Sequence, residues 1–431
     1  MQLNPARRPA ISLVVFCLVL SGCLLTGLGR GDETASGPAF AAGGDAEEAQ
    51  SRLSDPEFQA RAKAYTRGNY ILYLLDTIWT ALVAGWLAFS GLSSRAWRRL
   101  KSAAGEGSRA SVLYVAGLVT LLSLAALPLD YYDGFVREHA YGFSTQSAGG
   151  WVVDRVKGLG VSVIVFSIFV LPLYGAIRRF PRSWWILGAG LGCVFATILV
   201  AIAPVALDPI FNEFTPLPDA ELKTRILDLA HRNGIMADDV FQMDASTRSV
   251  HDNAYVTGLL GTQRIVLYDT LLSSYEPDEI AFVMGHEMGH YVLDHIWHGL
   301  ALSFLLIFFV FWVVYRAFNR ILARFPDRTG FKAAWDLSTL PLMLLIVTLV
   351  LFATLPIQSA FSRRMESEAD LFALQTADNP AAGPRAFRKM AARNLSDPRP
   401  AAIIEWFLYS HPAIGRRIER AEAYVEEAVR R

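Results

Sequence analysis

The stretch that decides the fold is His286-Glu287-Met288-Gly289-His290, which the apolar run HGLALSFLLIFFVFWVVY at 298–315 follows almost at once. Residues four apart share one face of a helix, so His286 and His290 can direct their imidazole nitrogens at one metal ion. Glu287 lies one residue further around the helix, where its carboxylate can serve as the base for a water on that metal. The pattern predicts a zinc hydrolase site beside a membrane span. A helix that carries two histidines and a glutamate by chance is the alternative.

The composition favours an integral membrane protein. Hydrophobic residues make up 53% of the 431 residues and charged residues only 19%. A soluble chain of this length usually carries more charge and divides into several domains. Lys and Arg together number 40, and so do Asp and Glu, so there is no basic excess for nucleic acid. We therefore expect the lipid bilayer, and no nucleic acid, as a partner. Cys17, Cys23 and Cys193 all lie in apolar runs, without the spacing of a metal or disulfide pair.

Six apolar runs are long enough, or nearly so, to cross a bilayer. They are predicted at Tyr70–Leu92, Ala110–Leu129, Gly158–Ile177, Trp184–Leu207, His298–Tyr315 and Leu337–Ala360. Several runs end in Trp or Tyr, which is typical of the membrane interface. The sequence therefore predicts a mainly α-helical membrane fold.

A seventh apolar run, Ile11–Leu28, follows Arg7-Arg8. Three interpretations stay open: a cleaved signal peptide, a lipoprotein signal with Cys23 as the lipid anchor, or an uncleaved first transmembrane helix. The following Gly29–Gln50 is rich in Gly, Ala and acidic residues, which is typical of a flexible linker.

Basic residues cluster in three short loops between the predicted spans. They are Arg95, Arg98, Arg99, Lys101 and Arg109; Arg178, Arg179 and Arg182; and Arg316, Arg320, Arg324, Arg328 and Lys332. Under the positive-inside rule these loops are cytoplasmic. We therefore expect a multi-pass membrane protein with the segment that carries His286 on the outer, periplasm-like side. Loops that bind lipid headgroups would also be basic.

The segment 208–297 has the composition of a folded polar domain. Asp219–Asn233 has helical spacing, and Arg264–Asp269 is typical of a short strand. Tyr275–Glu279 starts the helix that carries His286 and runs toward His295, with Pro and acids in its first turn.

Four other residues of the motif helix and its end carry expectations of their own. Gly285 and Gly289 each cost the helix about 1 kcal/mol relative to alanine, which indicates the close approach of another element or room for the metal. His295 and His298 are expected at the end of this helix, where either can stabilise its C-terminus.

A catalytic zinc site needs three protein ligands and one open position, so the two histidines require a third. The best candidate lies in Ser362–Asp370, which continues the last apolar run as a helix. Glu366 and Asp370 share a face there, so Glu366 can bind the metal while Asp370 hydrogen-bonds a ligand histidine. A juxtamembrane helix whose acids pair with neighbouring arginines is the alternative, and the residues alone leave both open.

Two further side chains have expected positions. Glu368 lies on another face from Glu366 and is expected in solvent. His411 precedes a basic amphipathic helix, where it can donate to a transition-state oxyanion or simply begin the helix.

The chain resembles the integral-membrane zinc CAAX prenyl endopeptidases of type I and their bacterial relatives. The resemblance covers residues 65–425 and rests on several stretches in the same order. They are Phe135–Phe143 with Gln146; Ala203–Pro204 and Asp208–Asn212 with Phe214–Leu217; Asn253–Tyr255 with Gly258; Arg264–Leu272; His286–His290; Ser362-Arg363 to Glu366 with Ala369-Asp370; and His411-Pro412.

This resemblance implies about seven transmembrane helices around a chamber, closed by a gluzincin-type zinc protease domain that carries a small β-sheet. It assigns His286, His290 and Glu366 as ligands of one Zn²⁺ and Glu287 as the catalytic base. It further matches Asp370 to a proton donor or support of a ligand, His411 to a histidine near the scissile carbonyl, and Asn253, Ala254 and Tyr255 to a substrate-binding edge strand.

The function that follows is a membrane-embedded zinc metalloendopeptidase similar to the CAAX prenyl proteases. Its expected substrate is a peptide or protein, prenylated or membrane-associated. Eukaryotic members are described with a cytosol-facing site, whereas the basic loops here indicate an outward one, which would rarely meet prenylated chains. A quality-control protease and a non-catalytic membrane protein with a structural metal site are the alternatives.

These inferences divide the chain into six segments. They are a signal-like or first transmembrane segment (1–28), a polar linker (29–68), transmembrane helices (69–207), the protease domain with the metal motif (208–297), two transmembrane helices (298–360) and the C-terminal part of the protease domain (361–431).

Overall fold

The computed structural model describes residues 2–3, 29–30, 46–105, 107–257 and 263–431. Its α-helices are α2 (Ala46–Ser54), α3 (Pro56–Phe89), α4 (Leu92–Ala104), α5 (Ser108–Tyr131), α6 (Glu138–Tyr141), α7 (Ala148–Arg179), α8 (Trp184–Ile202), α9 (Asp208–Phe211), α10 (Ala220–Arg232), α11 (Asp269–Ser274), α12 (Pro277–Val292), α13 (His295–Arg324), α14 (Pro326–Thr329), α15 (Leu340–Thr376), α16 (Ala382–Arg393), α17 (Ala402–Leu408) and α18 (Ile414–Arg430). Its strands are β1 (Gln2–Leu3), β2 (Gly29–Arg30), β3 (Phe214–Pro216), β4 (Val240–Met243), β5 (Ala254–Thr257) and β6 (Arg264–Tyr268). Short π or 3-10 turns are η2 (Tyr132–Arg137), η3 (Ala203–Leu207), η4 (Ala245–Thr247) and η5 (Leu337–Thr339).

Six helical segments in the described part of the chain are long and apolar enough to cross a membrane. They are Pro56–Phe89, Ser108–Tyr141, Ala148–Arg179, Trp184–Phe211, His295–Arg324 and Leu337–Thr376. Five of the six predicted runs lie wholly within them. The run Tyr70–Leu92 is interrupted instead, because α3 ends at Phe89, Gly91 adopts φ 71° and α4 begins at Leu92. The run Ile11–Leu28 lies outside the described residues.

Apolar side chains cover the outside of the helical bundle as well as its interior. Ile78 and Trp86 of α3 and Leu305 of α13 are exposed, an arrangement that suits a surface against lipid. Phe169 and Leu173 of α7 are fully buried between neighbouring helices. This distribution fits a multi-pass membrane protein.

A second core lies in the polar segment 208–297 and the C-terminal helices. The sheet has the strand order β3-β4-β6-β5, with β4 and β6 parallel and the other neighbours antiparallel. Ile226 of α10, Ile265 of β6 and Phe282 of α12 are buried in this core. The predicted helix Asp219–Asn233 is α10 and the predicted strand Arg264–Asp269 is β6, so both predictions are confirmed.

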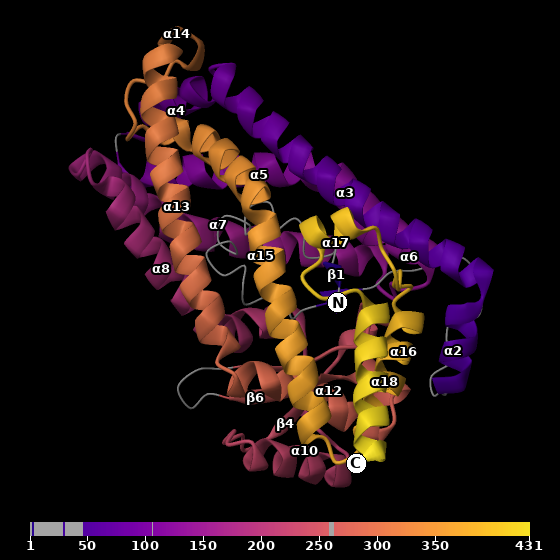
Figure 1. Ribbon diagram of the computed structural model, residues 1–431. Coiled ribbons are helices and arrows are strands. Elements are labelled where there is room, and N and C mark those ends of the chain that lie inside the picture. Colours follow the sequence, from indigo (N-terminus) through magenta and orange to yellow (C-terminus); the bar gives the residue numbers. More distant parts are fainter. Residues whose placement is uncertain (1, 4–28, 31–45, 106, 258–262) are drawn as a thin grey trace.

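α15 joins the two parts of the fold. Its first half is the apolar run, and the part beyond Ser362 is polar and packs on α12. Figure 1 shows α15 extending from the end of the molecule near α4 and α14 to the end that holds α10 and α12. The last membrane helix therefore carries Glu366 directly into the protease domain, as the continued helix predicted.

Candidate metal centre

Two glycines let α12 and α15 approach closely. A Cβ atom on Gly289 would lie 3.1 Å from Cδ1 of Phe372 and 3.3 Å from Cα of Ala369. A Cβ atom on Gly285 would lie 3.5 Å from Cα of Ala373. The expected use of these glycines, the close approach of another element, is confirmed. Their position brings the histidine face of α12 opposite the acidic face of α15.

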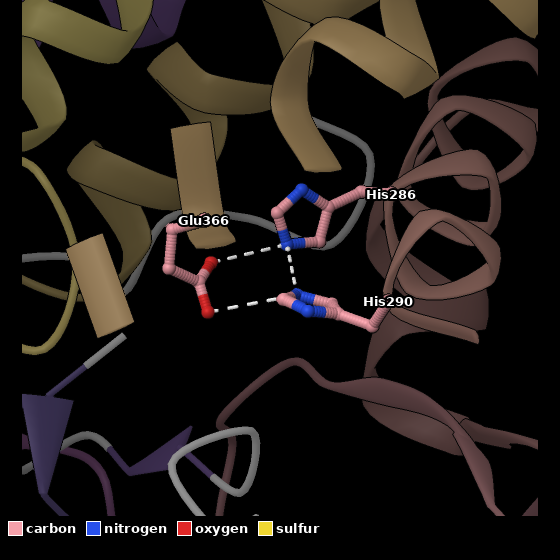
Figure 2. Close-up of side chains that lie close together, drawn as sticks. All are labelled: His286, His290 and Glu366. Atoms are coloured by element: carbon pink, nitrogen blue, oxygen red, sulfur yellow. Dashed lines mark hydrogen bonds and ion pairs between the residues drawn. The ribbon is translucent and has the colours of Figure 1, made fainter. Parts of the chain in front are cut away.

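Three side chains meet between these helices, and Figure 2 shows them pointing toward one another. Nε2 of His286 lies 3.2 Å from Nε2 of His290 and 3.2 Å from Oε2 of Glu366. Nε2 of His290 lies 3.5 Å from Oε1 of Glu366. All three residues come from the predicted ligand set, and their donor atoms lie within 4.8 Å of one another.

These distances fit a tetrahedral metal site. Donors about 2.1 Å from zinc in tetrahedral geometry are about 3.4 Å apart, close to the separations between the three side chains. Oε2 of Glu366 is buried and makes no hydrogen bond of normal geometry, although two imidazole nitrogens lie within 3.2 Å. A buried carboxylate oxygen in that position is suited to a cation. The residues present therefore fit a bound metal ion.

Asp370 connects His286 to a buried arginine. Its Oδ1 lies 2.9 Å from Nδ1 of His286, on the side of the ring away from Glu366. Arg417 of α18 donates to both carboxylate oxygens of Asp370, from Nη2 at 2.6 Å and from Nε at 2.8 Å. A metal-binding histidine typically has such a partner on its other nitrogen, which fixes the orientation of the ring.

The sequence analysis did not identify Arg417. A signal was present, because Arg417 lies four residues before Ala421 on the buried face of an amphipathic helix. An arginine is rarely buried unless a carboxylate pairs with it. Finding that carboxylate required the fold, since Asp370 is 47 residues away in sequence.

His295 lies in a different place from the one expected. α12 ends at Val292, Asp294 adopts φ 56°, and His295 begins α13. Nδ1 of His295 lies 3.0 Å from Nδ1 of His290, and its Nε2 lies 3.2 Å from Oε2 of Glu368. The expectation that His295 stabilises the end of the motif helix is wrong, and Glu368, expected in solvent, is only half-exposed because it pairs with His295.

Glu287 and His411 line one cavity with His286 and Arg417. Burial raises the pKa of the Glu287 carboxyl to about 7, near the operating range of a general base. Burial lowers the pKa of His411 to about 4, although its Nε2 lies 3.0 Å from Oε2 of Glu366. His411 is therefore neutral at neutral pH and can act as a hydrogen-bond donor.

The two candidate ligand histidines differ in pKa. Burial lowers the pKa of His290 to about 3, so its ring is neutral. Burial also disfavours the charged form of His286, but its contacts with Asp370 and Glu366 outweigh that effect and raise its pKa to about 10. Without a metal, a protonated His286 and Arg417 together offset the charges of the two carboxylates.

The segment Asn253–Tyr255 forms the side of the cavity along the sheet. β5 is the strand at one edge of the sheet, and Asn253 and Ala254 line the same cavity as His286. The ring centroid of Tyr255 instead lies 6.4 Å from that of Tyr268, and Tyr255 points to the face of β5 opposite to Ala254.

Arg363 anchors the chain segment that leads to His411. Its Nη1 donates to the carbonyl oxygens of Glu405 at 2.8 Å and Tyr409 at 2.6 Å. The sequence alternative, in which Arg363 pairs with acids of its own helix, is wrong for this residue. Arg364 does pair with Glu368, at 2.9 Å.

With this geometry described, comparison with known proteins gives the family. The model of peptidase family M48 matches residues 216–425, which contain the whole metal centre. A second model, described as the N-terminal part of CAAX prenyl proteases with five membrane helices, matches residues 46–213. The "Uncharacterized metalloprotease YhfN" of Bacillus subtilis is 34% identical over 367 residues, covering 85% of this chain and 86% of that protein. The chain belongs to peptidase family M48.

Other relatives also match over most of their length. "CAAX prenyl protease 1" of Saccharomyces cerevisiae is 33% identical and covers 74% of this chain and 73% of its own length. The crystal structure of S. mikatae Ste24p superposes with a TM-score of 0.74 at 26% identity, over 97% of this chain and 99% of that one. These similarities confirm the expected fold class, a mainly helical membrane bundle with a protease domain that carries a small sheet.

The family establishes the activity in general terms. The chain is a multi-pass membrane metalloprotease, a hydrolase that acts on peptides or proteins with the help of a metal ion. The resemblance to zinc CAAX prenyl endopeptidases is confirmed. The non-catalytic and quality-control alternatives are not favoured.

Proposed function

We propose that His286, His290 and Glu366 bind one Zn²⁺. The observation that carries this proposal is the 3.2–3.5 Å spacing of their donor atoms between α12 and α15. Among the described residues, the group that could hold a metal ion consists of these three side chains. Three protein donors leave the fourth position of a tetrahedral site open, as catalysis requires and a closed structural site does not.

The side chains around this centre have separate roles in the proposed hydrolysis. Zinc, when bound, polarises the peptide carbonyl and lowers the pKa of water to about 7. Glu287 accepts the proton of the attacking water, and its raised pKa suits that task. Neutral His411 donates a hydrogen bond to the developing oxyanion. Asp370, held by Arg417, orients the ring of His286.

We assign substrate backbone binding to Asn253, Ala254 and Tyr255. An extended peptide can add to the edge strand of a sheet, and β5 lies at one edge of the sheet, beside the cavity. A peptide added to β5 would pass Glu287 and His286. The domain boundaries given above stay predictions.

We further propose that the protease domain faces the periplasm from a bacterial inner membrane. The basic segments 95–109 and 316–332 lie on the same side of the membrane in this proposal. A contact between their helices supports it, because Oγ of Ser94 in α4 donates to the carbonyl of Thr329 in α14 at 2.9 Å. Both helices lie at the end opposite α10 and α12 (Figure 1). Basic ends of membrane helices are typically cytoplasmic.

The substrate that this orientation favours is a membrane-associated polypeptide. Relatives named CAAX prenyl protease 1 make a prenylated peptide the second candidate. A prenylated peptide and the same peptide without the lipid, offered to protein in vesicles, distinguish the two. Preferential cleavage of the prenylated peptide would favour the second candidate.

Glu287→Gln tests the mechanism. The variant should bind zinc as the parent does and lose at least about 100-fold in rate, because a missing general base costs that much. Glu426→Gln on the exposed face of α18 is the matched control and should cleave at the parent rate. Wild-type turnover by Glu287→Gln would overturn the assignment.

Single cysteines test the orientation. In intact cells, a membrane-impermeant thiol reagent should label a cysteine at Val429, in the protease domain, and should spare one at Arg328. The reverse labelling pattern would place the site in the cytoplasm and would make a prenylated peptide the favoured substrate.

A further inference from the structure

α17 (Ala402–Leu408, AIIEWFL) buries its charged side chain and exposes apolar ones, which is the reverse of a surface helix in water. Its charged residue, Glu405, is 4% exposed. Ile403 is 64% exposed and Trp406 is 52% exposed. A surface helix in water turns its polar face outward and its apolar face to the core. The outward face of α17 therefore resembles the outer face of the spanning helices, where Ile78 is 54% exposed.

Contacts with residues outside α17 hold Glu405 in its inward orientation. Its Oε1 accepts from the backbone N–H of Ala413 at 3.0 Å, and its carboxylate pairs with Arg416. Arg363 holds the carbonyl end of the same helix. These contacts fix the rotation of α17, so the exposure of Ile403 and Trp406 does not come from a loosely held segment.

α17 also lies against membrane-spanning helices. The ring centroid of Phe407 lies 5.1 Å from that of Phe352 in the apolar half of α15. The carbonyl oxygen of Phe407 accepts a hydrogen bond from the hydroxyl of Ser359. At the end of α17 the hydroxyls of Tyr409 and Tyr70 are 2.7 Å apart, and Tyr70 starts the apolar run of α3. Figure 1 shows α17 between α3 and α15.

Exposed apolar side chains on α3 begin next to this junction. Ile71 and Leu75, which follow Tyr70, are exposed. The end of α17 therefore lies next to the point where α3 begins to expose apolar side chains, as a helix against lipid does. An exposed Trp406 three residues before Tyr409, which contacts Tyr70, is typical of the aromatic belt at the membrane interface.

We propose that α17 is an interfacial helix whose outer face, Ile403 and Trp406, contacts the lipid bilayer. Tyr409 and His411 directly follow α17 and line the cavity of the metal centre. Lipid contact by α17 therefore brings a wall of that cavity to the membrane surface. If the proposed function holds, a polypeptide lying on the bilayer reaches Glu287 without leaving the surface.

Spin labels measure the lipid contact without reference to cleavage. Full-length protein without its native cysteines receives one label at Ile403 or at Trp406, in vesicles of phosphatidylcholine and phosphatidylglycerol. Ile78 on α3 is the lipid-facing control, and Val429 on α18, 82% exposed, is the water-facing control. Unchanged thermal midpoints identify labelled proteins that remain folded.

Power saturation with oxygen and with a water-soluble nickel chelate gives the result. The labels at Ile403 and Trp406 should follow Ile78, with oxygen the stronger relaxant. Relaxation by nickel as strong as at Val429 would overturn the proposal. So would exclusion of both reagents together with dipolar broadening, because that result indicates a second copy or another protein on this face.

A cleavage assay separates this proposal from the proposed function. Ile403→Asp with Trp406→Asp should lower the cleavage of a lipid-anchored peptide at least several-fold and leave a soluble peptide of the same sequence unaffected. Equal losses for both peptides would contradict the surface role of α17. A protein that shows lipid contact but cleaves neither peptide would contradict the proposed function alone.

Discussion

Nδ1 of His295 lies 3.0 Å from Nδ1 of His290. If Nε2 of His290 binds the metal, its Nδ1 carries the proton and donates it to His295, whose Nε2 then donates to Glu368. A second histidine thus takes the place that a carboxylate or a carbonyl usually has beside a metal-binding histidine.

Loss of this partner should weaken the metal centre. His295→Ala removes the acceptor for His290, and such partners are worth about 10- to 100-fold in metal affinity. Competition with a chromophoric chelator measures the affinity, and the spectrum of the Co²⁺-substituted protein reports the geometry. His298→Ala, on the same helix, is the control. Parent affinity in His295→Ala would show that the contact does not orient His290.

Arg417 should matter more for stability than its exposed neighbour. Arg417→Met removes the arginine that pairs with the buried Asp370 and leaves only His286 beside it, which costs about 3–5 kcal/mol. Arg420→Met removes an exposed contact with Ser367 and should change stability by about 0.5 kcal/mol or less. Thermal unfolding in detergent compares the two variants. Similar midpoints would mean that Asp370 does not depend on Arg417.

Zinc affinity should rise with pH. The pKa of His286 is raised to about 10 by Asp370 and Glu366, so below that pH zinc must displace a proton. His290, with its pKa lowered to about 3, is neutral throughout and adds no dependence. Affinity should therefore increase about tenfold per pH unit from pH 6 to pH 8. An affinity that is constant over this range would contradict a protonated His286.

Gly289 should not tolerate a side chain. Gly289→Val puts atoms against Phe372 and the backbone of Ala369, so α12 and α15 must separate. Overpacking of this kind costs about 1–3 kcal/mol and should also weaken zinc binding. Gly117→Val on α5, where a Cβ meets nothing within 4 Å, is the control. The assays are thermal unfolding and chelator competition, and equal behaviour of the two variants would disprove the close approach.

Local patterns in the sequence were sufficient to predict the membrane spans and to place His286 and His290 on one face of a helix. Long apolar runs predict spans because an unpaired backbone polar group cannot remain in lipid. The spacing of His286 and His290 follows from the period of one helix. The same argument left Glu366 open between a metal ligand and a member of a charged juxtamembrane helix, because Glu366 is 76 residues from His290 in sequence. The resemblance to a family favoured the ligand.

Tertiary structure alone decided the residues that act through contacts between distant segments. Arg417 reaches Asp370 from another helix, and His295 reaches His290 because Asp294 adopts a left-handed conformation that a non-glycine residue seldom takes. The inward Glu405 of α17 has the same origin, because the partners that bury it lie outside its helix. A local pattern encodes the face of a helix, and only packing determines what that face meets.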